Sequence, residues 1–295
     1  MQESAMKRIR YAVPIVAILL VLLCTACACS RVQAPDFGRT TVYIDPSDGD
    51  GFSDAEIVAH NTVPATVRLR AEFSNAPDAA GTAFFINKDG YLLTNRHCVT
   101  LSDAPPYLAA KANKLYYISE TGKRYYLEIV AISNDRDLDL ALLRIRDFVG
   151  ESPYIPFSDA VENPLAQDDD TILRYGQPCY AIGNPEDLGV TFARAMISNP
   201  YYLESDSVGN PIGKPDLLLD CNINHGNSGG PLVGADSKLV GVVYARMESD
   251  GNKINNVYGI GCAIPCYRVV AFLQTIAMQT PNGQPFYYEY DPPQA

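Results

Sequence analysis

The chain has 295 residues, of which 47% are hydrophobic and 19% are charged, a composition typical of a folded globular protein. This length suffices for one large all-β domain, or two small domains, with a buried core. The formal net charge is -11 and no basic stripe stands out along the sequence, which argues against nucleic acid as a partner.

Residues 1–29 have the pattern of a targeting segment. Basic residues within positions 7–10 precede an apolar run from Tyr11 to Leu23. Three interpretations stay open: a cleaved signal peptide, a lipoprotein signal with Cys27 as the lipidated residue, or an uncleaved membrane anchor, since residues 11–28 are uncharged and long enough to span a bilayer. All three predict export of the rest of the chain, with the basic end left in the cytoplasm.

Residues 30–62 are polar and broken by turn-forming residues, which predicts a linker or N-terminal arm. His60 lies in this segment, and we expect it to be a solvated histidine without a functional role.

From Val63 onward, short apolar runs alternate with turn residues, as is typical of an all-β sandwich or barrel. The clearest hairpin joins residues 81–86 to residues 91–94 through a turn that ends in Asp-Gly. His97 follows directly, at the exit of the second strand, where its imidazole can face a cleft. The next expected strands are residues 115–118, 126–132 and 140–145, and Asp139 immediately precedes the last of them.

Residues 150–170 contain several prolines and an acidic run at 168–170, and they predict a connection between two halves of the fold. A second series of expected strands follows at residues 179–182, 190–197, 216–221, 239–245 and 257–264. The fold class is therefore all-β, with two six-stranded antiparallel β-barrels at about 63–150 and 170–265.

After Pro265 the apolar residues recur at helical spacing, which predicts a short amphipathic C-terminal helix at about 266–279. The C-terminal tail, residues 281–295, is rich in proline and aromatic residues and shows no clear periodicity.

The segment at 220–231, DCNINHGNSGGP, places Ser228 among glycines. A serine hydroxyl becomes a nucleophile when a base takes its proton and when donors already face the developing oxyanion. Gly226 leaves room for a substrate carbonyl to approach the N–H groups of Gly226 and Ser228. The alternative is an ordinary Gly/Ser/Asn turn between two strands. An α/β-hydrolase elbow is excluded, because that fold needs a histidine after the serine and all three histidines of this chain precede it.

Five cysteines lie in the body of the chain, and in an exported protein these can form disulfides. An odd number leaves at least one unpaired within a monomer, and spacing alone does not give the connectivity. They are Cys98, Cys179, Cys221, Cys262 and Cys266. Neither paired CxxC units nor a histidine pair at ligand spacing is present, so we expect no metal and no cofactor.

Four separated segments resemble the trypsin-like (chymotrypsin-fold) serine peptidases, most closely their HtrA-type bacterial branch. GTAFFINKDGYLLTNRHCV resembles the family's His block, DLDLALLRI its Asp block, CYAIGNPEDLGVTFARAMIS its AIGNP strand and hairpin, and INHGNSGGPLVGADSKLVGV its Ser block. Four motifs in the right order make a specific signal. The resemblance implies a trypsin-like peptidase domain at 63–280 with chymotrypsin-like barrels. HtrA-type proteins usually continue into PDZ domains, and here we expect none.

By position, the resemblance implies that Ser228 is the nucleophile, His97 the general base and Asp139 the carboxylate that orients the imidazole. The family's acid stands directly before Leu-Ala, which selects Asp139 over Asp137. The N–H groups of Gly226 and Ser228 would form the oxyanion hole.

The resemblance also implies a set of substrate-binding residues. Asn222 would form the floor of the specificity pocket, with Arg246 near its mouth and Gly261 opposite. The strand edge near Tyr244 would pair with an extended peptide. His225 stands where HtrA-type enzymes usually have proline, and it either lines the substrate entrance or is a tolerated surface residue. Because an asparagine floor carries no charge, we expect small or medium apolar residues, and not lysine or arginine, before the cleaved bond.

Cys98 follows His97 as in chymotrypsin relatives, but the position of its usual disulfide partner, near Ala79 or Ala80, holds no cysteine. We therefore expect that bridge to be absent.

Together these features predict an exported serine endopeptidase of the bacterial cell envelope, tethered to the membrane at its N-terminus and acting on peptides or unfolded proteins. The alternative is a catalytically silent binding or scaffold module with the protease fold.

Overall fold

A computed structural model describes residues 43–45, 51–101, 110–135, 137–158, 173–205, 208–246 and 259–277. All of them belong to one compact unit, Pro35–Ala295. The expected targeting segment with Cys27, the acidic run at 168–170 and the C-terminal tail lie outside the described residues. No helix among the described residues is long and apolar enough to cross a membrane.

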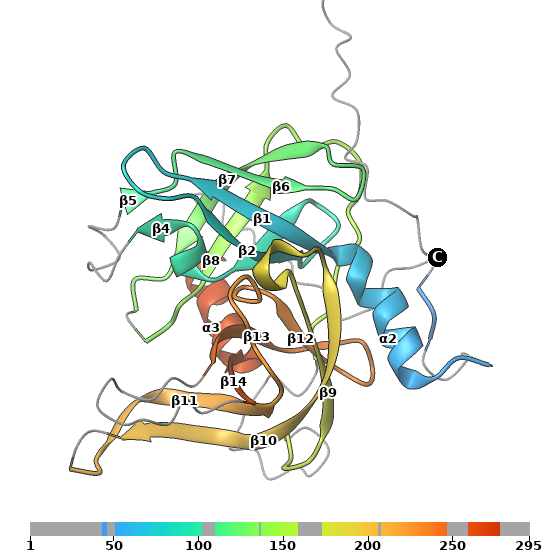
Figure 1. Ribbon diagram of the computed structural model, residues 1–295, viewed down its shortest axis with the longest axis vertical. Helices are drawn as coiled ribbons and strands as arrows, with labels where there is room; N and C mark the ends of the chain where they lie inside the picture. Colours follow the sequence, from blue (N-terminus) through green and yellow to red (C-terminus); the bar gives the residue numbers. More distant parts are fainter. Residues whose placement is uncertain are drawn as a thin grey trace, which may run out of the picture. The chain divides into compact units, whose positions relative to one another are not determined.

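The first barrel is closed by six antiparallel strands in the order β1-β2-β3-β8-β7-β6 (Figure 1). Their bounds are β1 Thr66–Glu72, β2 Ala79–Phe85, β3 Tyr91–Thr94, β6 Lys114–Ile118, β7 Arg124–Ile132 and β8 Ala141–Ile145. Alternate side chains of these strands point inward, as the two-residue period of a strand requires. Leu69, Phe85, Leu92, Tyr117 and Leu127 are among the residues that fill the interior.

The β2–β3 hairpin forms as the sequence predicts. The Asn87 Oδ1 atom accepts hydrogen bonds from the backbone N–H of Asp89 at 3.0 Å and of Tyr91 at 3.3 Å. Gly90 has a φ of 76°, a left-handed conformation that glycine adopts without strain. This turn fixes where β3 begins, and His97 follows the end of that short strand.

The second barrel is closed by six strands in the order β10-β11-β14-β13-β12-β9. Their bounds are β9 Pro178–Gly183, β10 Thr191–Ser205, β11 Pro211–Asp220, β12 Pro231–Gly234, β13 Leu239–Arg246 and β14 Ile260–Pro265. Every strand predicted from the sequence lies in or overlaps one of these elements. Strands β1 and β12 were not predicted; β1 carries arginines on its outer face, which interrupt the apolar pattern.

Short elements connect the strands. They are the 3₁₀ turns η1 Val63–Ala65, η2 Arg96–Cys98 and η4 Pro185–Asp187, and the two-residue strands β4 Thr100–Leu101 and β5 Ala110–Lys111.

The two barrels share a hydrophobic core at their interface. Phe84 and Leu140 from the first barrel pack in one buried cluster with Ile182 and Val242 from the second. The segment that follows β8 straps the barrels together, since the N–H of Ile155 donates to Phe85 at 3.0 Å and the N–H of Ser158 donates to Leu239 at 3.1 Å. This strap lies within the predicted connection at 150–170, of which residues 159–170 lie outside the described part.

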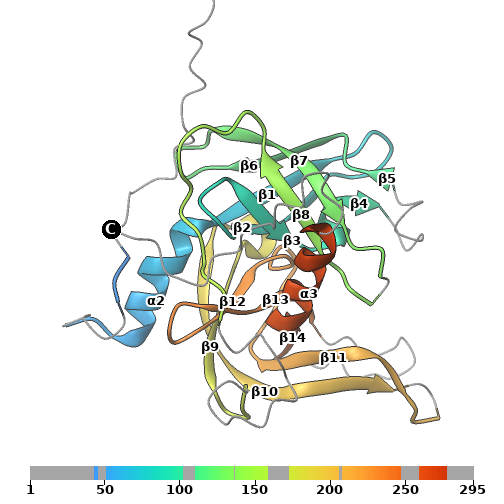
Figure 2. The same cartoon turned by 180° about the vertical axis from the view of Figure 1, so that it is seen from behind.

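The C-terminal helix α3, Cys266–Ala277, lies beside β13 and β14 (Figure 2). Val269, Phe272, Leu273 and Ile276, the residues whose spacing predicts the helix, are all buried in the interface cluster. The amphipathic helix is therefore confirmed.

The last part of the segment that was predicted as a linker or arm forms a helix. Helix α2 spans Asp54–Thr62, and Ser53 caps it in a capping box with Glu56. Ile57 and Val58 on this helix are buried, and His60 is half-buried in its last turn. The prediction of an arm through residue 62 is wrong here because the apolar period is too short to stand out, although the Ser-x-x-Glu cap is present in the sequence.

Candidate active site

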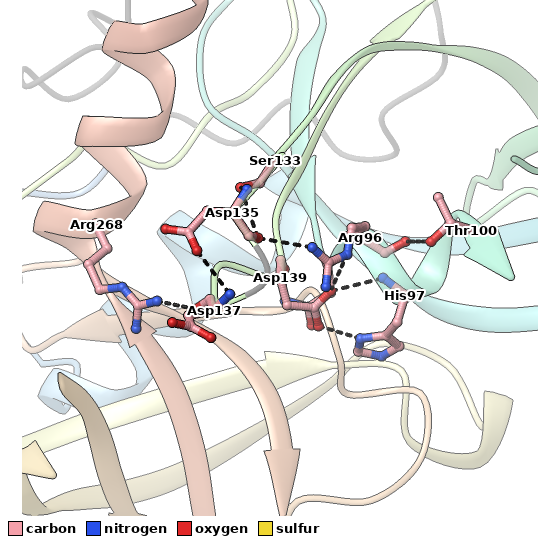
Figure 3. Close-up of polar contacts among 9 residues, drawn as sticks. Arg96, His97, Thr100, Ser133, Asp135, Asp137, Asp139 and Arg268 are labelled. Atoms are coloured by element: carbon pink, nitrogen blue, oxygen red, sulfur yellow. Dashed lines mark hydrogen bonds and ion pairs between the residues drawn. The ribbon is translucent and has the colours of Figure 1, made fainter. Parts of the chain in front are cut away.

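His97 and Asp139 are brought together by paired strand ends. His97 lies in η2, just after β3, and Asp139 lies just before β8, the strand that pairs with β3. The Nδ1 atom of His97 is 2.5 Å from Oδ2 of Asp139, and the backbone N–H of His97 donates to Oδ1 of Asp139 at 3.0 Å (Figure 3). Both carboxylate oxygens therefore hold His97, which fixes the orientation of its ring.

The neighbours of Asp139 fix the direction of its side chain. Leu138 and Leu140 are both buried in the core between the barrels, so the residue between them faces the other way. The Asn95 side-chain amide and the Arg96 N–H both donate to the carbonyl of Asp139, at 2.8 and 3.3 Å. The Asp139 side chain is consequently held toward His97.

The other two aspartates of this loop point elsewhere. The carboxylate of Asp135 pairs with Lys214 at 2.8 Å, and Asp137 is exposed. Of these three aspartates, Asp139 is therefore the one that contacts His97.

The electrostatics of the pair favour a charged imidazole next to a carboxylate. Partial burial lowers the pKa of His97, but the neighbouring Cys98 sulfur and the hydrogen-bonded Asp139 outweigh this and raise it. Burial raises the pKa of Asp139, but the hydrogen bond and charge of His97 outweigh this and lower it. The side chain of His97 is 49% exposed, so substrate can reach it.

Ser228 lies in the second barrel, in the turn between β11 and β12. Its carbonyl accepts a hydrogen bond from the N–H of Thr82 in the first barrel at 2.9 Å and lies 3.6 Å from the Sγ atom of Cys98, the residue after His97. Its hydroxyl donates to the carbonyl of Tyr244 at 3.1 Å. The backbone contacts thus place the serine turn against the segment that carries His97.

The predicted oxyanion turn has its two N–H groups free to bind an anion. The carbonyl of His225 accepts from the N–H of Glu186 at 2.7 Å, and the carbonyl of Asn227 accepts from the N–H of Gly230 at 2.9 Å. In a trans peptide the N–H points opposite to the carbonyl, so the next N–H groups, of Gly226 and Ser228, point away from those partners. Within the described part of the chain, neither N–H takes part in a hydrogen bond.

Gly226 is required in this turn for two reasons. Its φ is 93°, which other residues rarely adopt, and a Cβ at this position would overlap the carbonyl oxygen of Asn184. The turn therefore forms only with glycine at this position.

The β9–β10 turn supports the oxyanion turn from behind. Asn184 is fully buried, and its Oδ1 atom accepts from the N–H of Gly189 at 2.9 Å while its amide donates to Asp187 at 3.1 Å. Asp187 in turn forms an ion pair with Arg70 of the first barrel. The AIGNP segment resembles the family, but this supporting role was not predicted, because it depends on the tertiary contact with Arg70.

Among the residues around the expected pocket floor, Ile223 contacts Gly261. Asn222 is exposed, whereas Ile223 is buried and its side chain is what a Cβ on Gly261 would overlap. Because successive residues of an extended segment face opposite ways, a shift of one residue exchanges the inward and the outward side chain. Ile223 is therefore the residue opposite Gly261, and sequence reasoning missed it.

The remaining predicted binding residues lie at the edge of the site. His225 is exposed, and Tyr244 is half-buried with its hydroxyl bonded to Asp216 at 2.8 Å. Strand β13 pairs with β14 as far as Arg246, but its pairing with β12 ends at Val242. Residues 244–246 thus lie beyond the last β12 pair.

All five cysteines of the described part are buried free thiols. Burial raises the pKa of Cys179 to about 12 and of Cys221 and Cys262 to about 11, which keeps them protonated at neutral pH. The described residues contain no group of three or more metal-ligating side chains.

The family model of the Trypsin-like peptidase domain matches residues 81–242, more than half of the chain. This chain belongs to that family. The matched region includes His97, Asp139 and Ser228, so the strand ends and turn described above lie within the peptidase domain.

Two curated relatives and one solved structure show how close the resemblance is. The probable periplasmic serine endoprotease DegP-like of Bartonella henselae is 30% identical over 202 residues, which is 68% of this chain and 34% of the relative. The protein of the same name from Rhizobium meliloti is 31% identical over 196 residues, 66% of this chain and 33% of the relative. The chain thus spans about a third of the length of these relatives.

The solved structure of the HtrA-type protease AlgW with tripeptide is 26% identical, with a TM-score of 0.57, and the match covers 79% of this chain and 65% of that one. Together with the two closed six-stranded barrels, this confirms the expected chymotrypsin-like fold and the resemblance to the HtrA-type branch.

Proposed function

We propose that this protein is a serine endopeptidase that hydrolyses peptide bonds with Ser228 as nucleophile, His97 as general base and Asp139 as orienting carboxylate. The observation that carries the proposal is the 2.5 Å contact between His97 Nδ1 and Asp139 Oδ2. This contact occupies Nδ1 and leaves Nε2 of His97 available to take the proton of the Ser228 hydroxyl.

Catalysis begins when the Ser228 hydroxyl, now bonded to the Tyr244 carbonyl, rotates toward Nε2 of His97. The Oγ atom attacks the substrate carbonyl carbon while Nε2 takes the hydroxyl proton. The C–N bond then breaks as Nε2 returns this proton to the leaving amine, which leaves an acyl-enzyme. A water molecule then attacks the acyl-enzyme in the same way, with His97 again taking and returning the proton. This step releases the carboxylic acid product and restores the Ser228 hydroxyl.

The oxyanion formed in both steps is bound by the N–H groups of Gly226 and Ser228. Their directions are already set by the hydrogen bonds of the preceding carbonyls to Glu186 and Gly230. Donors fixed before the reaction need no reorganisation when charge develops, and removing one typically costs about 10²- to 10³-fold in rate.

The substrate binds as an extended strand. Residues 244–246 of β13 offer backbone groups beyond the last β12 pair, and an unfolded segment can add there as a further strand. Ile223 beside Gly261 makes the neighbouring pocket apolar, which favours small or medium apolar side chains before the cleaved bond.

The site of action that we propose is the bacterial cell envelope, with a role in protein processing or quality control. Export is supported by the basic and apolar pattern of residues 1–29, and the two DegP-like relatives are described as periplasmic. A tether at the N-terminus, through Cys27 or the apolar run, belongs to the same proposal.

The test is intact-mass spectrometry after treatment with diisopropyl fluorophosphate, on the wild type and on Ser228→Ala. A single adduct on the wild type alone is expected, together with cleavage of an unfolded protein that falls by about 10⁶-fold in Ser228→Ala. Folded wild type that takes up no adduct would instead identify a silent module of the same fold.

A further inference from the structure

Arg268, in the first turn of α3, has a buried side chain. Only 4% of the residue is exposed. One terminal nitrogen donates to the carboxylate of Asp216 and, at 3.3 Å, to the carbonyl of Pro215. The other donates to the carbonyl of Asp137 (Figure 3).

These partners belong to different barrels. Asp137 lies in the loop of the first barrel, two residues before Asp139. Asp216 lies on β11 of the second barrel, and its other carboxylate oxygen accepts the hydroxyl of Tyr244 at 2.8 Å. The Arg268 guanidinium therefore bridges the loop that carries Asp139 and the strands β11 and β13, which lie near Ser228.

The bridge reaches both halves of the active site. The backbone carbonyl of Tyr244 accepts the Ser228 hydroxyl at 3.1 Å. Asp137, Asp139, Asp216 and Tyr244 line one small pocket, so the network borders the catalytic carboxylate directly.

We propose that Arg268 is a positioning residue, which holds the Asp139 loop against β11 and β13 so that His97 and Ser228 meet at reacting distance. This inference rests on the proposed peptidase function. Arg268 touches no reacting atom, and it acts through Asp137 on one side and through Asp216 and Tyr244 on the other.

Arginine suits this position because its planar group presents several N–H donors in fixed directions. A lysine could keep the charge pair with Asp216, but its single ammonium cannot also reproduce the directed bond to the Asp137 carbonyl. Lysine at position 268 would therefore keep the charge but lose the geometry of the bridge.

The experiment compares Arg268→Lys and Arg268→Met with the wild type, and with Arg194→Met as a control. Arg194 is exposed on β10, so its loss removes the same charge from the same barrel without touching the bridge. For each protein we would measure the thermal midpoint, kcat and KM on an unfolded peptide, the rate of fluorophosphonate labelling, and the pH profile of kcat/KM.

We expect Arg268→Lys to stay folded, with KM near the wild-type value and kcat and labelling rate reduced about 10- to 100-fold, because a shift of about 1 Å costs that much. The acidic limb of the pH profile should also move, since a displaced Asp139 supports the charged imidazole less well. Arg268→Met should show the same kinetic change with a larger loss of thermal stability.

Wild-type kcat, labelling and pH profile in folded Arg268→Lys would overturn the inference. So would a lysine variant that fails to fold, because the residue would then be structural alone. A wild type that does not react with fluorophosphonate would instead reject the proposed function, so the two failures are distinguishable.

Discussion

Thr82 in the first barrel donates its backbone N–H to the carbonyl of Ser228 in the second at 2.9 Å and its hydroxyl to the carbonyl of Gly226 at 2.7 Å. The same hydroxyl accepts the N–H of Asn184 at 2.9 Å. One fully buried side chain thus joins the serine turn to the β9–β10 turn that supports it.

Replacing Thr82 by Val keeps the shape but leaves the Gly226 carbonyl and the Asn184 N–H without this partner. We expect a loss of about 1–3 kcal/mol in the free energy of unfolding, measured by urea denaturation, because buried groups would be left unsatisfied. The kcat should also fall, since the oxyanion turn is no longer fixed. Thr191→Val, at an exposed threonine, is the control, and equal losses in both variants would contradict the argument.

The pH dependence of activity follows from the His97 and Asp139 pair. The general base must be neutral, so kcat/KM is low below the pKa of His97 and rises through it. Since this pKa is raised above its ordinary 6.5, the rise should occur at a correspondingly higher pH. Asp139→Asn removes the carboxylate, so the rise should shift to lower pH, and kcat should fall by about 10⁴-fold. An unshifted profile in the Asp139→Asn variant would show that Asp139 does not govern the histidine.

Gly226→Ala tests the oxyanion turn with a closely matched control. The new Cβ would overlap the Asn184 carbonyl, so the turn must shift, and kcat should drop by about 10²- to 10³-fold. Gly209 has nearly the same φ, 91° against 93°, but nothing lies within 4 Å of a Cβ there. Gly209→Ala should therefore carry the backbone strain alone and leave kcat unchanged. Similar kinetics of the two variants would rule out a special role for Gly226.

We expect substitutions of Ile223 and of Asn222 to have different effects on cleavage specificity. Ile223→Ala should enlarge the pocket beside Gly261 and shift cleavage toward larger apolar side chains, as read from a peptide library by mass spectrometry. Asn222→Ala should leave the preference unchanged, because Asn222 is exposed. If Asn222→Ala alters the preference and Ile223→Ala does not, the original assignment of Asn222 to the pocket floor is restored.

The sequence predicts those features that depend on neighbours along the chain. The Asp-Gly turn places β3 and so His97, and Gly226 predicts room for a substrate carbonyl beside the N–H groups of Gly226 and Ser228. Features that depend on distant side chains were not predicted. The Arg70 to Asp187 ion pair, the support of Gly226 by Asn184 and the bridge made by Arg268 each join residues far apart in the sequence, and no local pattern marks them. The contact of Ile223 with Gly261 was not predicted for another reason, since the direction of a side chain in an extended segment depends on a register that only the folded barrel fixes.

The division of the site between the barrels has a consequence for biosynthesis. A ribosome completes His97 and Asp139 long before it reaches Ser228, and Arg268 comes later still, on the last described helix. A nascent chain therefore contains the proposed general base before the proposed nucleophile, and both of these before the proposed positioning residue. The proposed site can therefore assemble only after the segment that contains α3 has been synthesised.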